Sequence, residues 1–243
     1  MLSRCEMMNT QLKIATWNVE RPNLTTKRQR EKVDAIHAEL KYHPADIFIL
    51  TETNECISPG TDHDHHSEPL DKEAGGDYYE EGERRVSIWS GYPIIERLNV
   101  KDSLTTACAV LQTPFGNLAV FGSIIGIHGI RDGFDADLQN QMEDLKRFAA
   151  AGYNICYAGD FNMSFCDNYY TKESARSQLT DLFSTLKMKN LTARIPQMID
   201  HIVVSESFLP SSSVEKECWN TDKKKARPIV LSDHKGVIVT IQL

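Results

Sequence analysis

The sequence contains no apolar run of about 18 residues, and it therefore predicts no transmembrane helix and no membrane partner. The first ten residues are polar after Leu2 and lack the apolar stretch of a secretory signal. The six cysteines are scattered without a CxxC pair, a pattern that favours reduced thiols over a disulfide framework. These absences together predict a cytoplasmic protein.

The sequence also lacks the excess of basic residues that is typical of proteins binding long duplex nucleic acid. Lys and Arg number 27 against 34 Asp and Glu, and the formal net charge is -7 at pH 7. This balance argues against a protein that coats DNA, and it leaves room for a compact site that binds an anionic substrate. With 41% hydrophobic and 25% charged residues, the composition is that of a globular protein and excludes disordered, collagen-like and coiled-coil classes.

Short apolar runs alternate with amphipathic segments along the chain. Apolar residues recur at helical spacing in residues 25–42, 135–150 and 174–186. Strands are predicted at 12–17, 46–51, 85–90, 107–111, 117–125, 153–158, 199–204 and 236–242. Many strands with few helices favour two stacked sheets covered outside by helices. We expect one domain over residues 1–243, with a flexible N-terminus at 1–11 and an acidic loop at 54–83.

Ionisable and amide side chains gather at the ends of the predicted strands, where a rigid scaffold positions reactive groups. They are Asn18, Glu20, Glu52, His128, Asp160, Asn162, Asp200, Asp233 and His234. Their carboxylate and amide oxygens are hard donors that suit Mg²⁺ or Mn²⁺. An aspartate such as Asp200 can hold His234 in one tautomer, and Asp160 can orient or deprotonate water. The set predicts metal-assisted attack of water on a phosphate ester.

Five motifs, in this order, resemble those of the endonuclease/exonuclease/phosphatase superfamily, in particular its deoxyribonuclease-like and exonuclease III-like members. They are Thr16-Trp17-Asn18-Val19-Glu20, Ile49-Leu50-Thr51-Glu52, Gly159-Asp160-Phe161-Asn162, Ile199-Asp200-His201-Ile202 and Ser232-Asp233-His234. The resemblance extends over nearly the whole chain. It implies an α/β fold, a four-layer α/β/β/α sandwich of two mixed sheets.

The resemblance also implies a metal-binding group and substrate contacts. Glu52 would be the principal ligand of Mg²⁺ or Mn²⁺, with Glu20, Asn18 and Asp233 near the metal. Asn18 would in addition contact the substrate.

The same resemblance implies roles in catalysis. Asp160 would activate or orient the nucleophile, and Asn162 would position the nucleophile and the phosphate. Asp200 would orient His234, which would contact the scissile phosphate or act as general base. Which of Asp160 and His234 takes the proton stays open. His128 would be a second histidine at the phosphate.

Arg84 and Arg85 lie next to a predicted strand and are further candidates for binding substrate phosphate. The alternative for both is a surface ion pair with the neighbouring acidic loop. Met198 occupies a position where the superfamily often has arginine. This departure from the superfamily pattern leaves the substrate open.

Three functions remain after this comparison of residues and motifs. The first is a phosphodiesterase, and most specifically a nuclease that cleaves DNA or RNA. The second is a phosphomonoesterase on a small substrate, such as a phosphoinositide, sugar phosphate or nucleotide, which the acidic net charge favours. The third is a non-catalytic binding module, which is disfavoured because every expected reactive position holds a competent residue. The oligomeric state is left open.

Overall fold

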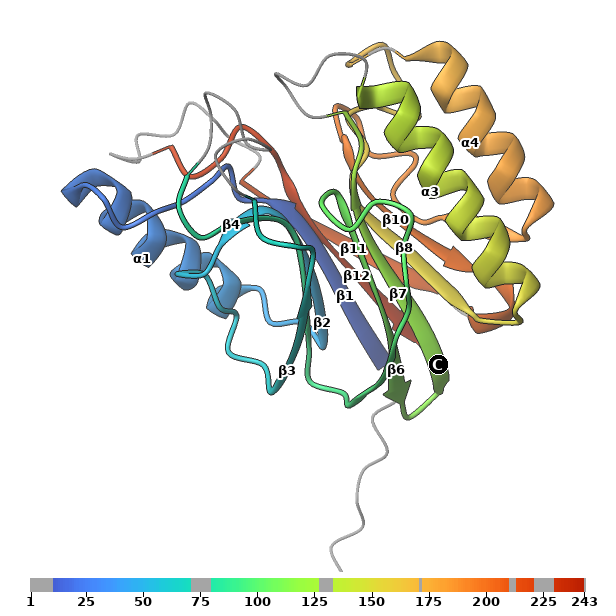
Figure 1. The fold of residues 1–243 in the computed structure, drawn as a ribbon, viewed down its shortest axis with the longest axis horizontal. Helices are drawn as coiled ribbons and strands as arrows, with labels where there is room; N and C mark the ends of the chain where they lie inside the picture. The colour runs from blue at the N-terminus through green and yellow to red at the C-terminus, as the bar shows by residue number, and fades with distance from the viewer. Residues whose placement is uncertain are drawn as a thin grey trace, which may run out of the picture.

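The computed structural model of the protein describes residues 11–70, 80–126, 133–170, 172–209, 213–220 and 230–242. Two β-sheets lie face to face between helices (Figure 1). The first sheet contains β1 (Gln11–Asn18), β2 (Ile47–Asn54), β3 (His63–His66), β4 (Glu83–Ser90), β11 (Val214–Trp219) and β12 (Gly236–Gln242). The second contains β5 (Ile94–Arg97), β6 (Thr106–Thr113), β7 (Gly116–Ile124), β8 (Ile155–Asp160), β9 (Met188–Asn190) and β10 (Asp200–Ser205).

Both sheets are mixed. The strand order is β11-β12-β1-β2-β4-β3 in the first sheet and β5-β6-β7-β8-β10-β9 in the second. β1 pairs with β2 in parallel, as β7 does with β8, and the other pairs are antiparallel. Each sheet therefore has a parallel pair near its centre, and these four strands carry most of the site described below.

The main core lies between the sheets and follows the two-residue alternation of the strands. In β1, Leu12 and Ile14 point into this core, whereas Ala15 and Trp17 pack on the opposite face against α1 (Lys27–Tyr42). Strands that are buried on both faces explain why the sequence shows continuous apolar runs there.

Helices cover the outer face of each sheet. α1 packs on the first sheet through Val33, Ile36 and Leu40. α3 (Gly133–Ala150) and α4 (Glu173–Thr185) lie side by side over the second, with Leu138 and Leu179 among their buried residues (Figure 1). This arrangement confirms the predicted four-layer α/β/β/α sandwich. No helix in the described part of the chain is long and apolar enough to cross a membrane.

The predicted acidic loop over 54–83 is wrong at its centre. His63–His66 forms strand β3, which pairs antiparallel with β4 at an edge of the first sheet. Backbone pairing with β4 stabilises this strand although its sequence contains no apolar residue. Residues 71–79 of the segment lie outside the described residues.

The predicted N-terminal boundary also needs correction. Gln11 is the first residue of β1 and pairs with Gln242, so it does not belong to a flexible N-terminus. Residues 1–10 lie outside the described part of the chain. Strands β5, β9 and β11 were not predicted, because the first two are short and the third is largely polar at a sheet edge.

Candidate active site

Three predicted site residues come together at one end of the space between the sheets. Asn18 ends β1, Asp160 ends β8 and Asp200 begins β10, each in phase with residues of its own strand that face the core between the sheets. Asp200 pairs in register with Asp160 across the antiparallel β8–β10 pair. Asn18 Nδ2 donates to Asp160 Oδ2 at 3.0 Å and joins the two sheets at this point.

A pocket of about 400 Å³ opens at this end of the sandwich. Its lining residues are Asn18, Glu20, Arg21, Glu52, Gly126, Asp160, Asn162, Tyr170, Asp233 and His234. Seven of them were predicted as site residues from the sequence, and the structure brings these seven together in one cavity. Asp200 lies behind His234 and is fully buried.

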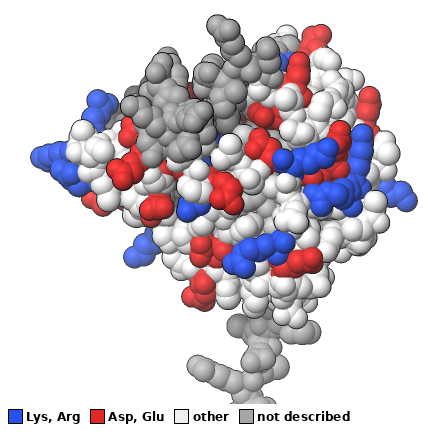
Figure 2. Space-filling model, in the orientation of Figure 1, with Lys and Arg blue, Asp and Glu red and all other residues white. Residues whose placement is uncertain are grey.

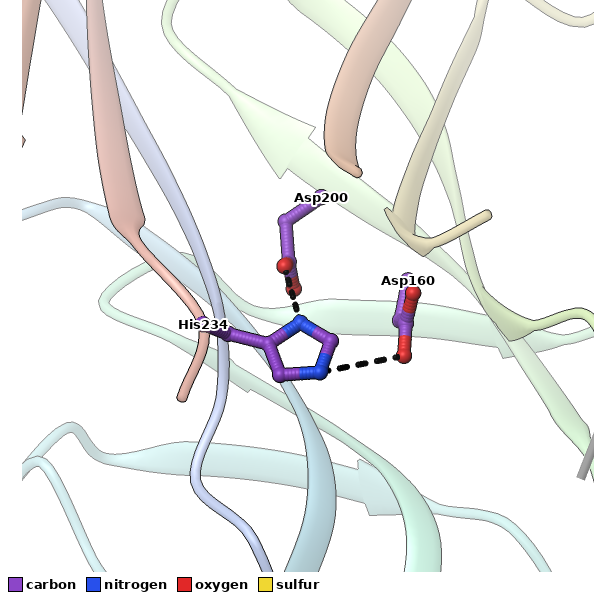
Figure 3. A group of neighbouring side chains, drawn as sticks. All are labelled: Asp160, Asp200 and His234. Atoms are coloured by element: carbon purple, nitrogen blue, oxygen red, sulfur yellow. Dashed lines mark hydrogen bonds and ion pairs between the residues drawn. The ribbon is translucent and has the colours of Figure 1, made fainter. Parts of the chain in front are cut away.

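One side of the pocket, which we call the histidine half, consists of Asp160, Asn162, Asp200 and His234 (Figure 3 shows the two aspartates and the histidine). His234 Nδ1 lies 2.7 Å from Asp200 Oδ2, and its Nε2 lies 3.9 Å from Asp160 Oδ2. Asn162 donates its backbone N–H to Asp160 Oδ1 at 2.9 Å, and its side-chain amide donates to the Ile125 carbonyl at 3.0 Å. These side chains are thus held by hydrogen bonds from several elements.

The loop that carries His234 is fixed by its own hydrogen bonds. Ser232 Oγ donates to the Asn18 carbonyl at 2.7 Å and accepts from the His234 backbone N–H at 3.0 Å. Asn220 Nδ2 donates to the carbonyls of Ser232 and His234, and Trp17 Nε1 donates to that of His234. The serine of the Ser-Asp-His motif therefore couples the loop to β1.

The pKa values of His234 and Asp160 both differ from those of the free side chains. Burial lowers the pKa of His234, but the carboxylates of Asp200 and Asp160 outweigh burial and raise this pKa to about 10. Burial and the nearby Asp200 carboxylate raise the pKa of Asp160, against the effect of His234 and of hydrogen bonds from Asn162 and Asn18, to about 7. At neutral pH an imidazolium thus lies beside a carboxyl group that can exchange a proton.

A second group of side chains at the pocket, which we call the glutamate half, consists of Glu20, Arg21, Glu52 and the buried Glu83, which contacts Arg21. Arg21 Nε lies 3.0 Å from Glu52 Oε2 and 3.3 Å from Glu83 Oε1. Glu83 also pairs with Arg85 at 3.0 Å, and both of these side chains are almost completely buried. Burial raises the pKa of Glu83, and Arg85 and Arg21 counteract the rise.

Backbone conformation concentrates strain around the pocket. Five of its lining residues have positive φ although none of them is glycine, and they are Glu20, Arg21, Glu52, Asn162 and Tyr170. Strict alternation would place Glu52 with Phe48 and Leu50 on the face covered by α1. Its φ of 47° interrupts the extended strand, and Glu52 lines the pocket instead. Such conformations persist where the surrounding structure enforces them, often at functional sites.

Two groups of side chains have the chemistry to hold a metal ion. The first is the group of Asp160, Asp200 and His234, whose ligand atoms lie within 4.8 Å of one another. The second is the set predicted from the sequence, Asn18, Glu20, Glu52 and Asp233, whose members all line the pocket. The second set offers only oxygen atoms, the donors that Mg²⁺ and Mn²⁺ prefer.

The structure does not bring the two predicted arginines into the pocket. Arg84 is half-buried, donates to the Ser67 carbonyl at 2.9 Å and lies near Glu55. Arg85 is 1% exposed and paired with Glu83, so the prediction that Arg85 contacts the substrate is wrong. His128 lies outside the described residues.

Sequence reasoning missed two side chains of the pocket. Arg21 directly follows Glu20 in the first motif, and this adjacency was the available signal. Tyr170 lies in the segment after Asn162, and it is 44% exposed and packs against Tyr169 with 4.9 Å between the ring centroids. Nothing in the local sequence pattern distinguishes Tyr170 from an ordinary loop residue.

Comparison with known proteins places the chain in a family. The sequence profile of the Endonuclease/Exonuclease/phosphatase family matches residues 15–234. The chain belongs to this family. Family members are hydrolases that act on phosphoesters, so the pocket described above is the candidate active site of a phosphoesterase. No curated protein matches the sequence significantly.

Solved structures of several family members share the fold. The endonuclease domain of TRAS1, a telomere-specific non-LTR retrotransposon, is 15% identical with a TM-score of 0.64 over 96% of this chain and 99% of that chain. TDP2 of D. rerio, humanized by 14 mutations, is 14% identical with a TM-score of 0.68 over 96% and 100%. Sphingomyelinase C from Streptomyces griseocarneus is 14% identical with a TM-score of 0.62 over 95% and 99%. At these identities the likeness establishes the fold, and the substrate is a separate question.

Proposed function

We propose that this protein is a divalent-metal-dependent phosphodiesterase that cleaves DNA or RNA by attack of water on the phosphate. The observation that carries the proposal is the 2.7 Å pair of His234 and Asp200, with Asp160 3.9 Å from the other ring nitrogen, in a pocket that also contains Glu52. An acid, a base and a carboxylate-rich wall in one cavity are what hydrolysis of a phosphate ester requires.

The glutamate half fits Mg²⁺ or Mn²⁺. The carboxylates of Glu20 and Glu52, with Asp233 and the amide oxygen of Asn18, which also line the pocket, make an all-oxygen donor set. The histidine half suits this role less well, because its His234 faces Asp200 through Nδ1 and has a pKa raised to about 10, and a protonated imidazole offers no lone pair to a metal. When bound, the metal would neutralise charge that develops on the phosphate.

The geometry of the histidine half supports different roles for His234 and Asp160. His234 is protonated at neutral pH because its pKa is raised to about 10, and its Nε2 lies on the pocket side of the ring. We therefore assign it the phosphate contact. Asp160 has a pKa raised to about 7, which suits a group that takes a proton from water near neutral pH. Asn162 and Asn18 hold the Asp160 carboxylate in place.

A metal-dependent activity panel tests this function. The substrates are single-stranded DNA, duplex DNA, RNA, nucleotides, inositol phosphates and sphingomyelin, each with Mg²⁺, with Mn²⁺ and after chelation. We expect cleavage of a nucleic acid that requires the metal, and a loss of about 10³-fold or more in His234→Ala, whose circular dichroism should match wild type. Full activity in His234→Ala contradicts the proposal. Failure on every ester favours a non-catalytic binding module.

A phosphomonoesterase that acts on a small phosphorylated substrate is the second candidate. The net charge of -7 and the limited volume of the pocket favour it. On the face of the molecule drawn in Figure 2, the Lys and Arg side chains of the described residues are interspersed with Asp and Glu. Salt separates the two candidates, because cleavage of a long nucleic acid should fall by orders of magnitude between about 50 and 200 mM salt. Turnover of a small substrate should change little over this range.

A further inference from the structure

Arg21 holds a singular position in the pocket. Among the described residues that line it, four carry carboxylates (Glu20, Glu52, Asp160 and Asp233), and Arg21 is the one Lys or Arg. An anionic phosphate that enters such a cavity is repelled unless cations compensate the carboxylates. His234 supplies positive charge to the histidine half. In the glutamate half, Lys32 pairs with Glu20 at 3.3 Å and Arg85 with Glu83 at 3.0 Å, but neither lines the pocket, so Arg21 is the cation of this half that does.

Arg21 is held in place at both its backbone and its side chain. Its backbone N–H donates to the Glu52 carbonyl at 2.8 Å, and its φ is 49°. Its Nε lies between two carboxylates, 3.0 Å from Glu52 Oε2 and 3.3 Å from Glu83 Oε1. Loss of the contact with Glu52 would therefore leave the guanidinium attached to Glu83, beside the pocket.

Glu83 is itself a fixed anchor. Its side chain is 0% exposed, and Arg85 Nη1, on a side chain that is 1% exposed, lies 3.0 Å from the Glu83 oxygen that faces Arg21. Charges of alternating sign thus run from Glu52 through Arg21 and Glu83 to Arg85. Separating a buried pair of this kind leaves an uncompensated charge in the interior, so Glu83 and Arg85 remain together.

The Glu52 carboxylate cannot serve two cations equally well. The Oε2 atom that Arg21 contacts belongs to the residue that we assign as principal metal ligand, and a guanidinium repels a dication at that distance. Binding of the metal should therefore weaken the Arg21–Glu52 contact. The guanidinium, still attached to Glu83, has a planar set of donors suited to binding phosphate oxygens.

We propose that Arg21 is a phosphate-binding residue that pairs with Glu52 until a divalent cation takes this carboxylate, and that Glu83 and Arg85 are positioning residues that retain Arg21 at the pocket. The ligand class is a phosphate group bound together with a divalent cation. The inference rests on the proposed function and deepens it. Because linkage is reciprocal, the metal and the phosphate bind with positive cooperativity through Arg21.

Binding measurements on the full chain test this inference without turnover. Mn²⁺ binding is followed by electron paramagnetic resonance, and binding of inorganic phosphate at saturating Mn²⁺ by calorimetry, for wild type, Arg21→Gln and Arg21→Lys. In Arg21→Gln we expect Mn²⁺ to bind about fivefold tighter and phosphate about tenfold more weakly, since coupling of this size is ordinary. Arg21→Lys keeps the charge and should stay near wild type in Mn²⁺ affinity.

The opposite signs of the two changes distinguish this role from a structural one. Arg97→Gln, which removes the same charge from the exposed edge strand β5, is the matched control and should change neither affinity. Mn²⁺ affinity that is unchanged or weaker in Arg21→Gln, or unchanged phosphate affinity, overturns the role of Arg21. Absence of turnover on every ester overturns the proposed function alone, and a wild-type chain that binds no Mn²⁺ overturns both.

Discussion

The two halves of the pocket are built on different physical principles. The histidine half is fixed by hydrogen bonds at strand ends, and its Asp160 and Asp200 side chains are almost fully buried. The glutamate half is fixed mainly by ion pairs, and three of its residues have positive φ. Proton transfer needs groups that are fixed before the substrate arrives. Under our proposal, the metal site instead accommodates Arg21, which gives up its contact with Glu52 when the metal binds and stays attached to Glu83.

Removal of the Glu52 charge should have the largest effect and should act on the glutamate half alone. Glu52→Gln keeps the size of the side chain and removes the proposed metal ligand. We expect activity to fall about 10³-fold or more and Mn²⁺ affinity to fall with it. Glu55→Gln is the matched control, because exposed Glu55 contacts Arg84 outside the pocket. Unchanged Mn²⁺ affinity in Glu52→Gln would place the metal elsewhere.

Asp200→Asn should damage the histidine half and leave Mn²⁺ binding intact. Asp200 raises the pKa of His234, so the variant should have a His234 pKa below about 10, measurable by NMR titration of the ring. The protonated imidazole would then be lost at lower pH, and the alkaline limb of the activity profile should move to lower pH. We expect a loss of activity of about 10²- to 10³-fold at neutral pH. Loss of Mn²⁺ binding in this variant would instead support the metal group of Asp160, Asp200 and His234.

His201 is a buried residue that contacts the segment after Asn162. It is fully buried, with Nδ1 2.9 Å from Thr192 Oγ1 and Nε2 3.0 Å from the carbonyl of Met163, the residue after Asn162. Burial lowers its pKa to about 4. Below pH 6.5 the unfolded chain therefore binds a proton that the folded chain does not, and stability falls as pH falls from about 6.5 to about 4.

The loss of folding stability caused by His201 between pH 6.5 and pH 4 amounts to at most about 3 kcal/mol, and His201→Gln should remove this pH dependence. Urea unfolding of both proteins at several pH values between 7 and 4 measures the effect. The difference in unfolding free energy between wild type and variant at each pH separates the contribution of His201 from that of other titrating groups. A difference in stability that is the same at every pH would contradict a buried neutral histidine.

Arg84→Gln should have the smallest effect, because Arg84 lies outside both halves. We expect less than about a twofold change in activity and a stability loss of about 1 kcal/mol from the hydrogen bond to Ser67. Steady-state kinetics and denaturant unfolding measure the two quantities. A tenfold rise in KM would restore Arg84 as a substrate contact, as the sequence alone suggested.

Much of the histidine half, and its partner Asn18, could be predicted from sequence because their positions depend on local regularities. Asn18, Asp160 and Asp200 follow or begin strongly apolar strands, so strand ends and the two-residue alternation place them correctly. His201 belongs to one of the five motifs, but its burial and its partners depend on Thr192 and Met163 in other segments. Partners distant in sequence leave no local pattern.

The amino-acid sequence by itself determined the four layers and the group of acids and amides that accompanies His234, because hydrophobic periodicity and motif order are properties of the chain. Only the tertiary structure decided that Arg21 lies against Glu52, that Arg85 is buried beneath Glu83, and that His63–His66 forms a strand. The physical reason is that ion pairing, burial and edge pairing depend on which distant segments meet. The type of a residue and its neighbours in sequence do not specify which distant segments it contacts.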